Sequence, residues 1–512
     1  MNLNYKYILI FCLIIAGSFS QALASQLCNT IIPNNPASLN KLDAQPLKFK
    51  IISNRYEALA VRLEAIKQAK DTIELAVYIF KRDETGLLIL NALKEAIDRG
   101  VEVNLLVDSF GSFSVNGVLG SFRDYLETIV EYADKPGTKG SINVYYAQSA
   151  LNIRQVLSKS FLRLIEQGLL RDDSYLPISL NQRIHDKILI IDGNSRNSII
   201  FTGGSNLANN YSGIKNGTTG SYVDLDIIVK PDTINVESQL GNDQPSSINI
   251  SYQKYFEMLT NETPSRKLYG KLLGIFPNLF YKADIATITN ATPEVLSSKI
   301  FEWTQRIREN DYFNVGFSNG SGKLTSEYRN LINGNASIKG RWYRLFKDTD
   351  SKELSIKYNF TEQLRKSDNL VEIITPYPIF TLKSLKIIED LLIEKPDLEI
   401  HLFSNNKKYT DKLIVYWYFK KFVLPKISRM NDRPEIKNRF KVFLFEGAEK
   451  TDIKYVFNHA KFARFDSKTI LIGSSNYEPR SLRLNSESSL LLSGEDVGAS
   501  VDQHLTLIKG SS

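Results

Sequence analysis

Cysteine and histidine are both scarce in this chain of 512 residues, which contains two cysteines and four histidines. Cys12 lies in an N-terminal apolar run, so Cys28 is the one cysteine that remains if this run is removed. A single free thiol cannot form an internal disulfide, and the fold must therefore be stabilised by core packing. The sequence also shows no clear Asp or Glu cluster of the kind that holds a metal, so we expect neither a metal nor a cofactor.

The N-terminal apolar run, residues 7–16, is too short for a comfortable membrane span. Lys6 precedes it and the small-x-small sequence Ala22-Leu23-Ala24 follows it, which is typical of a secretory signal peptide. We expect residues 1–24 to be a signal peptide and 25–45 an exposed lead-in. The protein would then be periplasmic or secreted, in contact with a membrane surface. An uncleaved N-terminal anchor is the alternative.

The composition is that of a globular protein, with 43% hydrophobic and 23% charged residues. A chain of this length favours two domains of ordinary size. The net charge of +8 favours anionic partners, either lipid headgroups or nucleic acid, without choosing between them. A generally basic solvated surface explains the same charge.

Strands and helices alternate in both halves of the sequence, which predicts an α/β fold with helices packed over parallel strands. The expected strands are 47–52, 73–79, 101–107, 370–375, 398–403 and 440–445, with helices at 56–70, 87–98 and 382–394. Because the second half repeats the plan of the first, we predict an internal duplication. The two domains would span residues 46–280 and 281–512.

The pattern His-x-Lys-x-x-x-x-Asp occurs once in each half, and two of the four histidines open it. The runs 187–191 and 461–465 are apolar enough to be buried strands, and we expect each strand to include its His and Lys. Residues two apart in a strand point to the same side, so each His and Lys would face the same way and need polar partners. The aspartates have an odd offset from the lysines and precede Gly193 and Ser467; this favours holding a local turn over touching substrate. The six residues are His185, Lys187, Asp192, His459, Lys461 and Asp466.

A loop rich in small residues follows each motif after one further strand. The loops are Gly203-Gly204-Ser205-Asn206 and Gly473-Ser474-Ser475-Asn476. Small residues let the backbone approach a ligand, and Asn206 and Asn476 can donate to phosphoryl oxygens. Carboxylates further on, at Asp224, Asp226 and Glu487, could fix the tautomer of a histidine. His401 and His504 have no such companions, and we expect them to be structural.

On these motifs the sequence resembles the phospholipase D superfamily, in which they are called HKD motifs. The run from Gly473 to Ser481 with Asn485-Ser486-Glu487, and the runs 203–211 and 223–226, are similar to the bacterial cardiolipin synthase branch. The resemblance implies two similar domains, each a mixed, mostly parallel sheet flanked by helices. They would be related by a pseudo-twofold axis and share one active site. Ser205 stands where that branch usually has Arg, which affects acceptor preference.

The resemblance also implies hydrolysis or transphosphatidylation of glycerophospholipids by a monomer without a metal. His185 would attack phosphorus to form a phosphohistidine, and His459 would protonate the leaving alcohol. Lys187, Lys461 and the two loop asparagines, with Ser474 in support, would neutralise the phosphoryl oxygens.

Two other functions remain open at this point. One is an exported, metal-independent nuclease of the same superfamily, since a basic protein can also bind DNA. The other is a binding protein without catalytic activity, against which the two intact histidines argue. The aromatic and basic segments 268–282 and 412–421 suit a membrane interface. Buried helices with their lysines extended to solvent would give the same pattern.

Overall fold

The structure is a computed structural model that describes residues 44–108, 111–112, 123–147, 183–214, 220–232, 248–261, 284–327, 354–450, 452–483 and 485–510. The expected signal peptide, Cys28, nearly all of the lead-in, the boundary at 280/281 and the segment 268–282 lie outside these residues. Each of these therefore stays a prediction.

The first half contains eight strands and six helices within the described residues. They are β1 (Gln45–Ile52), α2 (Arg55–Gln68), β2 (Thr72–Val77), α3 (Glu84–Arg99), β3 (Glu102–Asp108), α5 (Arg123–Ala133), β4 (Ser141–Ala147), β5 (Ile188–Ile191), β6 (Ile199–Gly203), α8 (Asn209–Ser212), β7 (Ser221–Val223), β8 (Asp226–Pro231) and α9 (Ile248–Asn261), with α11 (Ile285–Thr289) after the gap. The Asn54 and Asp83 side chains cap α2 and α3, and Gly100 ends α3 at a φ of 103°.

The second half begins with α12 (Pro293–Leu296) and α13 (Ser298–Glu309), and α13 packs against α2. The remaining elements are β9 (Ser318–Ser326), α15 (Ile356–Lys366), β10 (Leu370–Ile374), α16 (Leu382–Glu394), β11 (Glu399–Asn405), η3 (Lys407–Tyr409), α17 (Leu413–Tyr418), η4 (Phe419–Val423), α18 (Leu424–Asn431), β12 (Phe440–Phe445), β13 (Ala448–Lys450), β14 (Ile453–Asn458), β15 (Phe462–Phe465), β16 (Thr469–Gly473), α19 (Pro479–Arg483), β17 (Ser488–Ser493), η5 (Ala499–Val501) and α20 (Asp502–Lys509).

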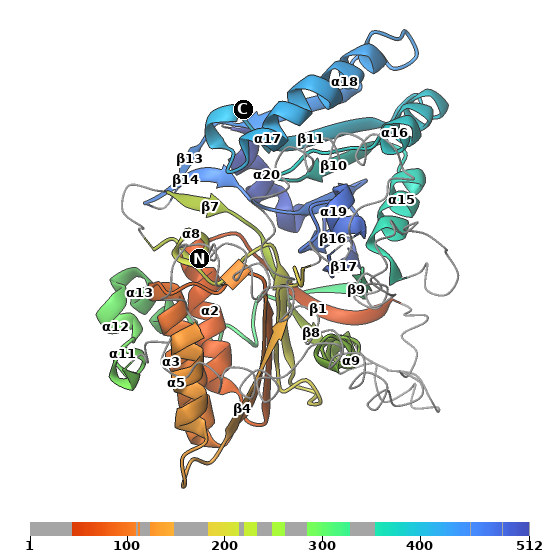
Figure 1. Cartoon of the computed structure of the whole chain (residues 1–512). Helices are drawn as coiled ribbons and strands as arrows, with labels where there is room; N and C mark the ends of the chain where they lie inside the picture. Colours follow the sequence, from red (N-terminus) through yellow and green to blue (C-terminus); the bar gives the residue numbers. More distant parts are fainter. Residues whose placement is uncertain are drawn as a thin grey trace, which may run out of the picture. The chain divides into compact units, whose positions relative to one another are not determined.

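One 14-stranded sheet runs through both halves in the order β12-β11-β10-β15-β16-β17-β9-β1-β8-β6-β5-β2-β3-β4. The pattern of strand pairing is the same from either edge of the sheet. Three parallel strands lie at each edge, and antiparallel strands follow them up to the central β9–β1 pair. In the first half, α2, α3 and α5 lie on one side of the sheet and α9 on the other (Figure 1). The prediction of two similar α/β halves is confirmed.

One expected pairing is wrong. The strand–helix–strand pattern predicted that β1 and β2 would be parallel neighbours. Instead β1 pairs antiparallel with β8 and β9, and β8, β6 and β5 separate it from β2. The predicted parallel crossovers are found for β2 and β3 over α3 and for β10 and β11 over α16. Position in the sheet depends on long-range pairing, which local periodicity does not report.

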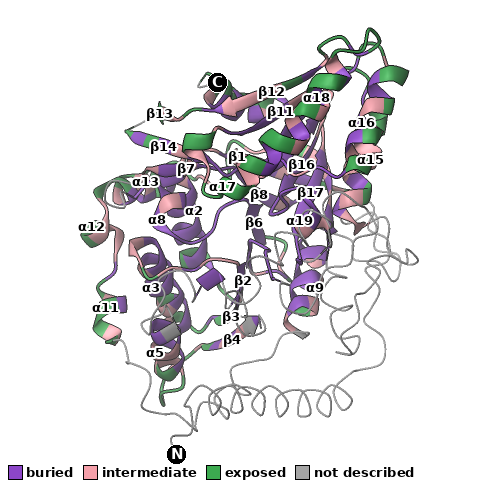
Figure 2. Ribbon diagram, turned by 45° about the horizontal axis from the view of Figure 1, so that its top comes forward, coloured by how far each residue is buried: buried purple, intermediate pink, exposed green. Residues whose placement is uncertain are grey.

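The strands that follow the two motifs are fully buried. All four residues of β5 and all four residues of β15 are buried, and the sheet interior is drawn in purple in Figure 2. The histidine and lysine of each motif lie directly before these strands rather than inside them. This corrects the expectation of a strand through the motif, but leaves the four side chains beside the buried sheet.

Candidate active site

The four His and Lys side chains of the two motifs are buried although they are polar. Their exposed fractions are 9% for His185, 5% for Lys187, 6% for His459 and 1% for Lys461. Buried polar groups of this kind require partners. The halves meet where these residues lie, because β6 of the first half contacts β16 and β17 of the second.

Each histidine is hydrogen-bonded to a carboxylate that belongs to the opposite half. His185 Nδ1 lies 2.8 Å from Glu487 Oε2, and His459 Nδ1 lies 2.7 Å from Asp224 Oδ2. A carboxylate at Nδ1 places the proton on that nitrogen and leaves the lone pair on Nε2. Both imidazoles are therefore prepared to act as a nucleophile or a base through Nε2.

The backbone positions these pairs. His185 N donates to Ser486 O at 3.0 Å, next to Glu487. His459 N donates to Val223 O at 2.8 Å, next to Asp224, where β14 runs parallel to β7. These backbone hydrogen bonds thus hold the carboxylate of each half beside the histidine of the other half.

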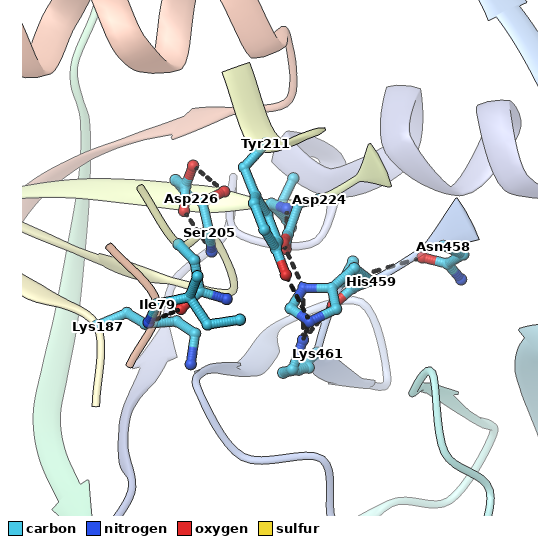
Figure 3. Close-up of polar contacts among 12 residues, drawn as sticks. Ile79, Lys187, Ser205, Tyr211, Asp224, Asp226, Asn458, His459 and Lys461 are labelled. Carbon is cyan, nitrogen blue, oxygen red and sulfur yellow. Dashed lines mark hydrogen bonds and ion pairs between the residues drawn. The ribbon is translucent and has the colours of Figure 1, made fainter. Parts of the chain in front are cut away.

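The two lysines act on both histidines. Burial, together with the positive charges of Lys461 and Lys187, lowers the pKa of His459 to about 3, although Asp224 opposes the change. Burial likewise lowers the pKa of His185 well below its usual value, with Lys187 and Lys461 adding to the effect. Figure 3 shows Lys187 from the first half beside His459 and Lys461 from the second. The site therefore holds two neutral imidazoles near two lysine side chains.

The lysines are themselves perturbed. Burial lowers the pKa of Lys187 to about 8 and that of Lys461 to about 7. Lys187 Nζ donates to His185 O at 2.7 Å, and Lys461 Nζ donates to His459 O. A cation in such a site, with part of its hydration removed, is suited to an anionic ligand.

The two carboxylates differ in charge. Burial raises the pKa of Glu487 to about 7, although Lys187 and the Ser474 hydroxyl, 2.6 Å from Oε2, oppose the rise. Burial would also raise the pKa of Asp224, but His459 and Lys461 outweigh it and hold this pKa well below its usual range. Asp224 is therefore ionised at neutral pH, whereas Glu487 titrates there.

The loop asparagines lie at the ends of β6 and β16. Asn206 Oδ1 accepts a hydrogen bond from Ile79 N at 3.1 Å. The NH₂ group of the Asn206 amide therefore points away from Ile79. Asn476 is 5% exposed, and its Oδ1 has no hydrogen-bond partner within the described structure. The Ser474 hydroxyl donates to Glu487 at 2.6 Å, and the Ser474 backbone also hydrogen-bonds to His185.

Asp192 and Asp466 lie outside this cluster and hold turns. Asp192 accepts from the backbone N–H groups of residues 70–72 at 2.8–3.1 Å. Asp466 accepts from those of residues 368–370 at 2.7–2.9 Å. Both have positive φ, 50° and 46°. Each aspartate thus ties the end of a motif strand to the start of its neighbouring strand, β2 or β10.

Asp226, which the sequence offered as a possible partner of a histidine, has no hydrogen bond to either motif histidine in the described part of the chain. It forms ion pairs of 3.1 Å with Arg55 and with Arg62. Ser205 Oγ accepts from Arg55 at 2.7 Å and donates to Asp226 at 2.7 Å. Ser205 stands where the cardiolipin synthase branch usually has Arg. A guanidinium still contacts this position, but it belongs to Arg55 of α2.

Several residues at the site were not identified from the sequence. The Tyr78 ring lies 4.8 Å from the His185 ring, and the Tyr211 ring 5.0 Å from that of His459. Asp186, between the motif histidine and lysine, accepts from Tyr255 at 2.9 Å and is bonded by Ser486. Asp186 follows the histidine by one residue, so its side chain points to the opposite side from that of His185. This offset is the one sequence signal that Asp186 contacts neighbouring residues instead of facing the same side as the histidine.

A cavity of about 320 Å³ adjoins His459. Tyr222 and Phe457 line it, and their rings lie 5.9 and 5.8 Å from the imidazole of His459. Its other lining residues are Lys408, Tyr409, Thr410, Asp411, Lys454 and Val456. The cavity is lined by side chains of both charges, and His459 is not itself one of its lining residues.

His401 and His504 lie apart from the cluster. His401 on β11 is bonded to Glu399 at 2.9 Å, and His504 on α20 is 1% exposed. Over the residues described, three or more His, Cys, Asp or Glu side chains nowhere gather as metal ligands. Nor does any helix in the described ranges have the length and apolar character needed to cross a membrane.

The chain is similar to known proteins over most of its length. It is 24% identical over 490 residues to an uncharacterized protein of Helicobacter pylori strain J99, covering 93% of this chain and 84% of that protein. It is 23% identical over 443 residues to a cardiolipin synthase of Clostridium perfringens strain SM101. This match covers 86% of the chain but only 65% of the synthase.

A solved structure shares the fold. The crystal structure of phosphatidylserine synthase from Haemophilus influenzae Rd KW20 superposes with a TM-score of 0.53 at 14% identity, covering 92% of this chain and 89% of that one. A family described as "Cardiolipin synthase, PLD-like domain" matches residues 63–216 and 361–508. Each matched segment contains one His-x-Lys motif and together they exceed half of the chain. The chain therefore belongs to the PLD-like domain family of cardiolipin synthase, with two copies of the domain.

Proposed function

We propose that this protein cleaves phosphodiester bonds of glycerophospholipids and transfers the phosphatidyl group to water or to an alcohol. The observation that carries the proposal is the pair of buried histidines, each bonded through Nδ1 to a carboxylate of the opposite half. Family membership supports the reaction class, and the phospholipid substrate is inferred from the names of relatives.

In the first step, His185 Nε2 attacks phosphorus and forms a P–N bond while the bond to the leaving alcohol oxygen breaks. His459 gives its proton to that oxygen. Its pKa of about 3 must rise for this role, and the negative charge of the phosphodiester raises it when the substrate binds.

In the second step, His459 removes a proton from water or an alcohol. The oxygen attacks phosphorus, and the P–N bond to His185 breaks. Lys187 and Lys461 neutralise the phosphoryl oxygens during both displacements. Asp224 stabilises the imidazolium that forms on His459, and Glu487 does the same for His185 when it is ionised.

The test is incubation of the purified protein with phosphatidylglycerol, phosphatidylethanolamine, phosphatidylcholine and plasmid DNA, each with and without EDTA. We expect phosphatidic acid or a new phospholipid, unchanged by EDTA. His185→Asn and His459→Asn should abolish it, while His401→Gln, a histidine outside the motifs, should retain it. Cleavage of DNA alone would replace the lipid reaction with the nuclease alternative, and loss of activity in EDTA would exclude a metal-free mechanism.

The assignment of the two histidines is tested by trapping. Substrate labelled in the phosphatidyl phosphate, quenched during turnover in alkaline denaturant because the P–N bond of a phosphohistidine is labile in acid, should leave label on the peptide containing His185. Label on the peptide of His459 would exchange the two roles.

A further inference from the structure

The helix α17 exposes apolar side chains on the surface of the second half. Leu413 is 63% exposed, Ile414 45% and Trp417 43%. The following residues, Tyr418 and Phe419, are only 3% and 1% exposed and anchor the helix in the core. Figure 2 shows α17 largely in the colour of exposed residues. An adjacent set of large exposed apolar side chains is costly in water and marks a binding surface.

The surroundings of this apolar face are basic. The segment 407–421 contains five lysines and one acidic residue, Asp411. Asp411 accepts from the Tyr377 hydroxyl at 3.0 Å and lies 3.7 Å from Lys412. Lys421 Nζ lies 4.7 Å from the centre of the Trp417 ring, so cationic and aromatic groups share one surface. The charge complements an anionic partner.

The same segment reaches the candidate active site. Residues 408–411, shortly before α17, line the same cavity as Tyr222 and Phe457, whose rings lie 5.9 and 5.8 Å from that of His459. A surface that binds through α17 would therefore lie beside this cavity. This arrangement favours a partner that also supplies the substrate.

We infer that α17 docks onto the surface of an anionic phospholipid bilayer. The docking surface consists of Leu413, Ile414 and Trp417 together with Lys407, Lys412, Lys420 and Lys421. The apolar side chains enter the boundary between headgroups and acyl chains, and the lysines contact lipid phosphates. The choice of a bilayer as partner rests on the proposed function, but the binding can be measured without catalysis.

The same surface shows why the aromatic segment 412–421 is neither wholly a buried helix nor wholly an exposed one. Residues 413, 414 and 417 face solvent, whereas residues 418 and 419 face the core. A test that changes Phe419 would disturb packing, so the informative substitutions are at the exposed positions.

The experiment is flotation of the full chain with vesicles of phosphatidylcholine alone or with phosphatidylglycerol added, using the inactive His185→Asn background. We expect binding to the anionic vesicles that weakens as salt is added. Combined Leu413→Ser, Ile414→Ser and Trp417→Ser should weaken it at least about tenfold. Replacement of the four lysines by Gln should remove the preference for anionic vesicles.

The matched control is the double variant Val295→Ser and Leu382→Ser, which removes apolar side chains that are 69% and 47% exposed on α12 and α16. It should bind vesicles as the parent does. Circular dichroism and thermal melting should show that every variant is folded. Undiminished binding by the folded triple variant, or equal losses in the control, would overturn the inference.

Other partners give different results. A dimer that dissociates in the triple variant would assign the face to a second copy of the chain, and a selective loss of DNA binding would assign it to nucleic acid. Either result without vesicle binding overturns the inference.

Hydrolysis of a monomeric short-chain phospholipid by the wild type separates docking from catalysis, because this substrate needs no bilayer. Vesicle binding without hydrolysis of the monomeric lipid defeats the proposed function alone. Activity on the monomeric lipid without vesicle binding defeats docking alone.

Discussion

The two histidines are chemically alike, but their carboxylate partners are not. Asp224 is held ionised by His459 and Lys461, whereas burial raises the pKa of Glu487 to about 7. An ionised partner orients a neutral imidazole and stabilises the imidazolium, while a protonated carboxyl does this weakly. His185 should therefore gain its full reactivity only where Glu487 loses its proton.

We expect kcat/KM to rise with pH through about 7 as Glu487 ionises. It should fall again between about 7 and 8 as Lys461 and Lys187 lose charge. The measurement is the pH dependence of kcat/KM, which reports the free enzyme. Glu487→Gln should abolish the rising limb and match the wild type only at acidic pH.

Asp224→Asn is the matched control for this experiment. It should lower kcat/KM by about a hundredfold or more at every pH but keep the rising limb. A rising limb that survives in Glu487→Gln would assign the titration to another group.

The turns at Asp192 and Asp466 show how single elements are held in place. Each side chain accepts several backbone N–H groups at the start of the adjacent strand. Each also has a left-handed backbone, which Asp and Asn tolerate better than most residues. These aspartates stabilise the sheet around the motifs and do not contact the reacting groups.

We expect Asp192→Ala and Asp466→Ala each to lower the free energy of unfolding by about 1–3 kcal/mol, because charged hydrogen bonds and a favourable residue for positive φ are lost. Urea denaturation measures this change. The Asn variants should lose less, since one side-chain oxygen remains. At temperatures where the variants are folded, kcat should change less than about twofold. A large loss of kcat in a stable variant would place the aspartate in the reaction.

The whole molecule forms its site from both halves of the chain. The central β1–β9 pair joins the two parts of the sheet, and β7 of the first half pairs with β14 of the second. Since each histidine depends on a carboxylate across this junction, neither half contains a complete site. A single full chain, in contrast, contains both histidines and both carboxylates of the candidate site.

We therefore expect a mixture of His185→Asn and His459→Asn proteins to be inactive, because each chain lacks one histidine of its own site. The measurement is phospholipid turnover after mixing, and after joint refolding. As a control, wild type diluted into either variant should keep its specific activity. Recovery of activity in the mixture would show that the site is shared between subunits.

Local spacing was enough to single out the candidate site residues that the structure brings together. The two-residue offset predicted a common side for His185 and Lys187, and the odd offset predicted a turn role for Asp192, because face and turn depend on neighbouring residues alone. Helix and strand positions followed from periodicity, as in α16, whose bounds match the expected range 382–394.

Residues far apart in the sequence were brought together only by the tertiary structure. It assigned Asp224 to His459 and Glu487 to His185, and directed Asp226, two residues from Asp224, to Arg55 instead. It also moved β1 to the centre of the sheet and left Trp417 exposed while burying Phe419. Such outcomes depend on which strands pair across the two halves, and pairing energy is shared among many distant residues. The residues next to a given residue in the sequence therefore do not determine which distant strand it pairs with.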